Sequence, residues 1–289
     1  MISTLHPYIS NSKLLLGGML ILEHRIEVEK GVSLFVNDIG KGEPVILLHG
    51  WPLNQKMYEY QMNVLPSWGF RAIAIDFRGY GKSDAPYEGY DYSTMADDVR
   101  KVIDKLKLKN SVLAGFSMGG AIAIRYMARH KAHRISKLML FGAAAPAFVK
   151  SPEWPLGMTP FEVESLLHET NNNRPLMIEG LLKNFFYQKL DQPFHQWFQS
   201  IALQTAGYAT AFSLKALRDE VLFHDLNKIT VPTAIFHGKH DRICPFDFAK
   251  SMHKKIQSSK LISFEQSGHG LFFDELDKFN HELKKFISQ

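Results

Sequence analysis

The chain has 289 residues, of which 45% are apolar and 22% are charged. This composition is typical of one large or two ordinary globular domains with a full hydrophobic core, and it excludes disordered, collagen-like and low-complexity proteins. The net charge is +5, and the basic residues are spread from Arg25 to Lys285, so we expect no nucleic-acid partner. The single cysteine, Cys244, excludes an intrachain disulfide and a cysteine-based zinc site, and it fits a reducing compartment.

An apolar segment near the N-terminus is too short to cross a membrane. Lys13 is followed by nine apolar or glycine residues, 14–22, which do not span a bilayer. A secretory signal would continue into small residues, whereas the charged residues Glu23 and Arg25 come next. We therefore expect no membrane span and a cytoplasmic protein in which residues 1–22 form an N-terminal extension, with either Met1 or Met19 as the native start.

From residue 25 onward, short apolar runs alternate with helical patterns. Eight runs predict strands, the first two joined as a hairpin by a Lys30-Gly31 turn: 25–29, 32–38, 44–49, 71–76, 111–116, 137–141, 233–237 and 261–264. Helical spacing is clearest at 94–106, 118–130 and 276–286, the first with Thr94 and Asp97 as an expected capping box. Because parallel neighbours need crossover helices, this alternation predicts an α/β fold with a mostly parallel, eight-stranded sheet flanked by helices.

The alternation stops at residue 146 and resumes at 228, leaving a segment with helical spacing and many aromatic residues. The segment is inserted after the sixth strand, at the edge where ligands bind in open α/β sheets. We therefore expect residues 146–227 to form a helical cap, with residues 23–145 and 228–289 as the core. An ordinary helical satellite would not need the aromatic content, so Phe185 and Trp197 are candidate substrate-binding residues.

The sequence Gly115-Phe116-Ser117-Met118-Gly119 directly follows a predicted strand and opens a predicted helix. This is the context of a nucleophile elbow. A sharp strand-to-helix turn strains the backbone of the central serine, so the positions two before and two after it must lack a side chain. The two glycines meet that demand, and Ser117 is the candidate nucleophile.

A serine hydroxyl is a weak nucleophile unless a base removes its proton and an acid orients that base. Asp241 follows one predicted strand and His269 follows the next, so both lie on loops at the edge toward which Ser117 projects. The order Ser117, Asp241, His269 is that of a serine triad built on an α/β sheet.

Other histidines near these residues receive structural interpretations. His237 and His240 precede Asp241, but they lack the i, i+4 helical spacing that places two imidazoles on one metal ion, so we expect no metal site. We expect His49 to form a hydrogen bond with the loop that follows it.

Acyl transfer also needs donors for the negative charge that develops on the carbonyl oxygen. The Met118 N–H, at the start of a helix, is one candidate donor. The second should come from the loop after the strand at 44–49, where Pro52 has no N–H and constrains Trp51, so we assign it to Trp51.

These residues resemble the α/β-hydrolase superfamily over nearly the whole chain. The signature segments are His49-Gly50-Trp51-Pro52, the run from Asp76 to Ser83, the elbow at Ser117, Asp241 and His269. More narrowly, the segments at 49–54, 115–120 and 141–146 resemble the cofactor-free haloperoxidase and aryl esterase branch. The resemblance implies the α/β-hydrolase fold and a serine carboxylic ester hydrolase that acts on small, aryl or short-chain esters without metal or cofactor.

In that branch, perhydrolysis often accompanies ester hydrolysis, with peroxide replacing water against the acyl-enzyme. A proline beside the oxyanion tryptophan, here Pro52, accompanies this activity, and we therefore include Pro52 among the candidate substrate-binding residues. The small-molecule ester is the only partner that the resemblance implies.

The same triad also serves C–C bond hydrolases and lactonases, and a hydrolase fold also serves as a small-molecule receptor. These remain alternatives to the ester hydrolase on sequence alone.

Overall fold

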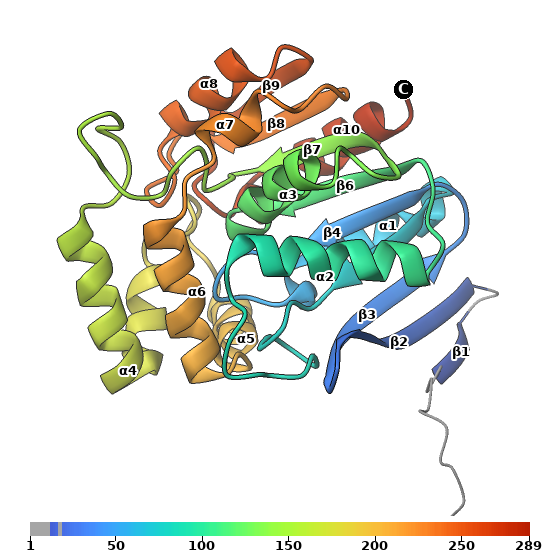
Figure 1. The fold of residues 1–289 in the computed structure, drawn as a ribbon, viewed down its shortest axis with the longest axis horizontal. Helices are drawn as coiled ribbons and strands as arrows, with labels where there is room; N and C mark the ends of the chain where they lie inside the picture. Colours follow the sequence, from blue (N-terminus) through green and yellow to red (C-terminus); the bar gives the residue numbers. More distant parts are fainter. Residues whose placement is uncertain (1–11, 17–18) are drawn as a thin grey trace, which may run out of the picture.

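The computed structural model describes residues 12–16 and 19–289, and its elements form a mixed sheet with helices on both faces (Figure 1). Residues 1–11 and 17–18 of the expected N-terminal extension lie outside the described residues. In the described part of the chain the sheet has nine strands, in the order β1-β2-β3-β5-β4-β6-β7-β8-β9.

The eight expected strands are present, and one further strand precedes them. Their bounds are β2 (Met19–Glu29), β3 (Val32–Gly40), β4 (Pro44–Leu48), β5 (Arg71–Ile75), β6 (Ser111–Phe116), β7 (Ile135–Phe141), β8 (Thr233–Gly238) and β9 (Ser259–Phe264). The added strand, β1 (Ser12–Leu16), pairs antiparallel with β2 at the edge of the sheet. Part of the extension is thus hydrogen-bonded into the sheet, which the sequence did not predict.

The six strands β5, β4, β6, β7, β8 and β9 are parallel to one another. The pairs β1–β2, β2–β3 and β3–β5 are antiparallel. Helices lie between the parallel strands along the chain: α1 (Glu59–Val64), α2 (Tyr92–Lys105), α3 (Met118–Arg129) and α8 (Phe246–Lys255), while α9 (Leu271–Asp274) and α10 (Leu276–Ile287) follow β9. Two short 3₁₀ helices, at Gln55–Tyr58 and Pro66–Trp68, flank α1.

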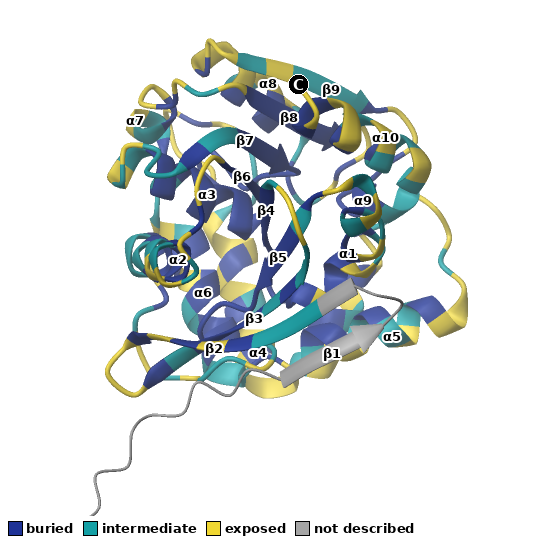
Figure 2. Cartoon of the chain, turned by 90° about the vertical axis from the view of Figure 1, so that its right-hand side faces the viewer, coloured by how far each residue is buried: buried dark blue, intermediate teal, exposed yellow. Residues whose placement is uncertain are grey.

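Figure 2 shows α2 and α3 on one face of the sheet and α1 and α10 on the other, with the central strands buried between them. The expected α/β sheet is confirmed.

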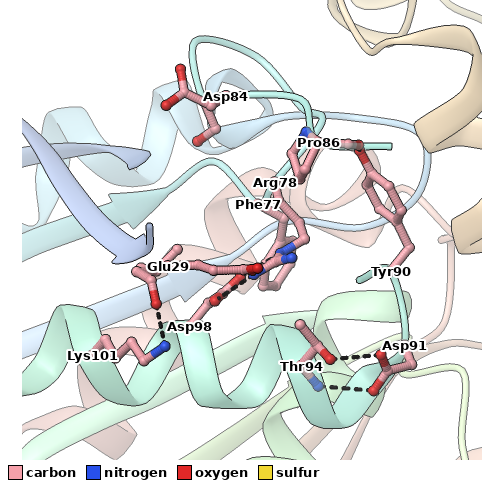
Figure 3. Close-up of polar contacts among 12 residues, drawn as sticks. Glu29, Phe77, Arg78, Asp84, Pro86, Tyr90, Asp91, Thr94, Asp98 and Lys101 are labelled. Atoms are coloured by element: carbon pink, nitrogen blue, oxygen red, sulfur yellow. Dashed lines mark hydrogen bonds and ion pairs between the residues drawn. The ribbon is translucent and has the colours of Figure 1, made fainter. Parts of the chain in front are cut away.

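Helix α2 begins two residues earlier than predicted, and its cap is a different residue. Asp91 is the N-cap, and its side chain accepts hydrogen bonds from the Thr94 N–H at 2.9 Å and from the Thr94 hydroxyl at 2.6 Å (Figure 3). The expected capping box at Thr94 and Asp97 is therefore wrong. Thr94 lies inside the first turn, where its N–H is one of the groups that a preceding cap satisfies.

The segment between β7 and β8 contains four helices, α4 (Pro160–Leu182), α5 (Gln192–Leu203), α6 (Gly207–Asp219) and α7 (Phe223–Leu226). Helix α4 bends at Asn173, whose backbone is non-helical at φ −152° and ψ 68°. The next residue, Arg174, donates to the carbonyl oxygens of Thr205 at 2.8 Å and Leu203 at 3.3 Å, at the end of α5. These hydrogen bonds connect α4, at its bend, to the end of α5. None of the described helices, α4 included, is long and apolar enough to cross a bilayer.

A buried ion pair joins α2 to the loop after β5. The Arg78 guanidinium donates to both carboxylate oxygens of Asp98, at 2.7 and 2.9 Å, and each side chain is only 2% exposed (Figure 3). A buried charge that loses its partner keeps its desolvation cost, so this pair fixes the position of α2 against the loop.

We expect Asp98→Ala to lower the free energy of unfolding by about 3 kcal/mol, because it removes the two short hydrogen bonds of the buried Arg78 guanidinium and leaves only the exposed Glu29 carboxylate, 3.2 Å away, as its ion-pair partner. Asp97 of the same helix is the matched control: it also binds an arginine, Arg129, at 2.7 and 2.8 Å, but those side chains are 35% and 46% exposed. Asp97→Ala should cost less than about 1 kcal/mol. Urea unfolding measures both, and equal losses would contradict the role of the buried pair.

Candidate active site

The turn from β6 to α3 holds Ser117 in a strained conformation. Its backbone has φ 52° and ψ −118°, as the sequence predicted for the centre of a sharp strand-to-helix turn. A Cβ added to Gly115 would overlap the backbone of Gly119, and one added to Gly119 would overlap the carbonyl oxygens of Leu48 and His49. Both glycines are therefore required for this turn to lie against the end of β4.

Backbone hydrogen bonds secure the turn to the neighbouring strand. The Ser117 N–H donates to the Phe141 carbonyl at 2.9 Å, and the Ser117 carbonyl accepts from the Ala144 N–H at 3.1 Å. The serine is thus held rigidly between β4 and the end of β7, and its side chain lines a cavity that His269 also lines.

His269 and Asp241 come together although 28 residues separate them in the sequence. The His269 Nδ1 lies 2.7 Å from the Asp241 Oδ2, and both side chains are at most 1% exposed. A carboxylate only accepts hydrogen bonds, so Nδ1 carries the proton of this hydrogen bond and Nε2 is the ring nitrogen that does not face Asp241. The rings of Phe116 and Phe185, with centroids 4.6 and 5.0 Å from that of His269, pack against the imidazole and hold its orientation.

The Asp241 carboxylate is stabilised in its ionised form. Burial by itself raises the pKa of Asp241, but the charge of His269 and the hydrogen bonds of His237 and His269 outweigh burial and hold the pKa below its ordinary value. The other oxygen, Oδ1, accepts from the N–H groups of Ile243 at 2.9 Å and Cys244 at 2.8 Å. Asp241 is therefore a fixed anion that orients the imidazole.

His237 is a second histidine on Asp241 that sequence reasoning missed. Its Nε2 donates to the Cys244 carbonyl at 2.7 Å and lies 3.3 Å from the Asp241 Oδ2, while its Nδ1 is buried with no partner in the described residues. The sequence feature that could have indicated this contact is the position of His237 at the end of the predicted strand, four residues before Asp241. His240 instead stacks on Tyr187, with ring centroids 4.3 Å apart.

One candidate oxyanion donor, Trp51, lies in the loop after β4, and the other, Met118, directly follows Ser117. Within residues 12–16 and 19–289, the backbone N–H groups of Trp51 and Met118 have no hydrogen-bond partner. Met118 is the first residue of α3, where the helix dipole favours negative charge. The Trp51 indole Nε1–H donates to the Thr210 carbonyl at 2.9 Å, and the Thr205 hydroxyl donates to the Pro52 carbonyl at 2.8 Å. The loop after β4 is thus tied to α6 and the turn before it.

The cavity beside Ser117 has a volume of about 320 Å³, within the range of small-molecule sites. Trp51, Ser117, Phe185 and His269 line it, and its apolar wall comes from Phe148, Met158, Leu166, Met177, Leu181 and Leu217. Of the three predicted substrate-binding residues, only Phe185 lies in this wall. Pro52 is buried but does not line the cavity, and Trp197 packs against Phe194 and Phe198, with ring centroids 5.2 and 6.2 Å away.

His49 supports the loop as expected. Its Nδ1 donates to the Gly50 carbonyl at 3.0 Å, and its Nε2 accepts from the Phe77 N–H at 3.1 Å. Burial lowers the pKa of His49 from the ordinary 6.5 to about 4, so the imidazole stays neutral near pH 7. Only the neutral ring can accept the Phe77 hydrogen bond.

Comparison with known proteins identifies the family. Residues 43–276 match the family model of the alpha/beta hydrolase fold. The AB hydrolase superfamily protein YisY of Bacillus subtilis is 53% identical over 91% of this chain and 98% of its own length. The chain therefore belongs to the α/β-hydrolase family.

Two solved structures are also similar to this chain. An esterase from Exiguobacterium antarcticum is 48% identical with a TM-score of 0.90, covering 92% of this chain and 99% of its own. A bromoperoxidase from Bacillus anthracis is 31% identical with a TM-score of 0.89, covering 92% of this chain and 100% of its own. The family, the fold and the esterase and haloperoxidase relatives agree with the resemblance seen in the sequence.

We expect the stability cost of His49→Gln to depend on pH. The folded protein holds His49 with a pKa of about 4 against 6.5 when unfolded, so the unfolded chain binds the extra proton between these values. The wild-type contribution is complete above pH 6.5 and is lost as pH falls toward 4. The penalty of the variant, measured by urea unfolding, should shrink by about 2–3 kcal/mol from pH 7.5 to 4.5. A penalty that is constant across this range would contradict a neutral buried His49.

Proposed function

We propose that this protein is a serine carboxylic ester hydrolase that acts through an acyl-enzyme, with Ser117 as nucleophile, His269 as general base and Asp241 as its orienting acid. The observation that carries the proposal is the 2.7 Å hydrogen bond from His269 Nδ1 to Asp241 Oδ2 at a cavity that the strained Ser117 also lines. This arrangement leaves His269 Nε2 as the proton acceptor of the site.

In the proposed mechanism, His269 Nε2 takes the Ser117 proton while Oγ attacks the ester carbonyl carbon. The N–H groups of Trp51 and Met118 stabilise the oxyanion, since neither is engaged with another described group. The intermediate collapses when the C–O bond to the alcohol breaks and His269 protonates the leaving oxygen. Water, deprotonated by His269, then attacks the acyl-enzyme, and the acid leaves as Ser117 regains its proton.

We also propose perhydrolysis as a side activity. Hydrogen peroxide replaces water: one of its oxygens gives its proton to His269 and bonds to the acyl carbon. The bond from that carbon to Ser117 Oγ then breaks, Oγ takes the proton from His269, and a peracid is released. The 31% identity to a bromoperoxidase supports this step. Pro52 is the neighbour of the proposed oxyanion donor Trp51, and the hydrogen bond from the Thr205 hydroxyl to its carbonyl oxygen positions this loop.

Residues 146–227 serve in this proposal as the cap over the active site, because residues of α4 and α6 and of the loops flanking α4 line the cavity. We also keep the proposed cytoplasmic location, which the single cysteine supports.

Ser117→Ala should abolish hydrolysis of chromogenic esters while leaving the thermal unfolding midpoint near that of the wild type. The loss arises because no oxygen remains to form the acyl-enzyme, and removal of a triad nucleophile typically costs about 10⁶-fold in kcat. Ser165→Ala, at an exposed position of α4 that does not line the cavity, is the matched control and should retain full activity. Wild-type turnover by the Ser117→Ala variant would contradict the role of Ser117 as the nucleophile. A folded wild type that hydrolyses no simple ester would shift it to a C–C bond or lactone hydrolase, or to a receptor.

The peroxide step has its own test. Wild-type protein mixed with acetate ester and hydrogen peroxide should produce peracetic acid, detected by bromide oxidation, and Ser117→Ala should produce none. Ester hydrolysis without any Ser117-dependent peracid would remove the side activity and leave the esterase proposal standing.

A further inference from the structure

One wall of the cavity is a stripe of helix α4. Met177, Gly180, Leu181 and Asn184 all line the cavity, and their spacing of i, i+3, i+4 and i+7 is that of one helix face continued past its end. Residue 180 therefore faces the cavity together with its neighbours on the stripe.

Gly180 is an unexpected residue at this position. Inside a helix, glycine costs about 0.5–1 kcal/mol relative to alanine. Its backbone does not require glycine, because Gly180 is not among the residues with positive φ. Packing does not require it either, because a Cβ built on Gly180 meets no atom within 4 Å. Gly180 is also exposed, so the missing side chain leaves open space at the rim of the cavity, on the face of α4 that lines it.

The surroundings of that space indicate what it accommodates. The neighbouring wall is apolar, formed by Met177, Leu181 and Leu166 among others. The charged residues that line the cavity are Lys150 and Arg242 with Glu162 and Glu169, so positive and negative charges balance. An uncharged, apolar group fits this environment better than an anionic or cationic one.

We propose that Gly180 determines substrate specificity by keeping this side of the cavity open for a bulky, uncharged, apolar group of the ester. The inference rests on the proposed ester hydrolase function. The preferred substrates are then esters in which one side of the scissile bond carries an aryl or medium-length alkyl group that lies along α4, and acetyl esters of small alcohols do not reach residue 180.

The test compares Gly180→Leu and Gly180→Ala with the wild type on two ester series. In one series the acyl chain grows from acetate to octanoate on a constant chromogenic alcohol, and in the other the alcohol grows on a constant acetyl group. In at least one series, Gly180→Leu should lower kcat/KM for the longest members by about tenfold or more, while acetyl esters of small alcohols are unaffected. Gly180→Ala should act in the same direction but less, and its unfolding midpoint should rise because alanine favours the helix.

Ser165→Leu is the control, since it adds the same side chain to an exposed position of α4 outside the cavity lining, and its profile should match the wild type. Unchanged length profiles for both Gly180 variants would overturn the inference while wild-type turnover upholds the esterase proposal. Equal loss on short and long esters would also overturn it, because the residue would then affect the reacting groups. A wild type inactive on every ester overturns the proposed function itself, and this inference with it.

Discussion

The close approach of the β6–α3 turn to the end of β4 is the constraint on which the rest of the site depends. Gly119 packs against the Leu48 and His49 carbonyl oxygens so closely that any side chain would overlap them. Ser117 can then adopt φ 52° at the head of α3, between β4 and β7. Without that approach, the loop after β4 would not lie near the serine, and the candidate oxyanion donor Trp51 would be separated from Met118, the residue next to Ser117.

The electrostatics of the site follow from the loop after β8. Asp241 is buried, and burial alone would favour its neutral form, yet two backbone N–H groups and two histidines surround its oxygens. The carboxylate therefore stays charged and holds His269 in one tautomer. His237 occupies the remaining side of Asp241, which means that the histidine that the sequence analysis considered as a metal ligand contributes to positioning the acid.

The segment between β7 and β8 lines the cavity and also helps to position the loop after β4. The Trp51 indole and the Pro52 carbonyl are bonded to Thr210 and Thr205, so the loop that carries a candidate oxyanion donor is positioned partly by residues at and just before α6. Changes in this segment therefore reach a candidate oxyanion donor as well as the cavity wall.

Local sequence patterns determined most of the strands, the strained turn at Ser117 and the loops that carry Asp241 and His269, because periodicity, glycine placement and strand ends act over a few residues. They misplaced the cap of α2, since Asp91 and Thr94 are both common N-cap residues and only the folded helix selects one. They also left unpredicted the pairing of β1 with β2. The tertiary structure decided the remainder: the second histidine on Asp241, the positions of Pro52 and Trp197 outside the cavity wall, and the open space at Gly180. The positions of Pro52 and Gly180 relative to the cavity depend on segments far apart in the chain. His237 lies only four residues from Asp241, but it meets the carboxylate because of how the loop after β8 folds, which residue spacing alone does not encode.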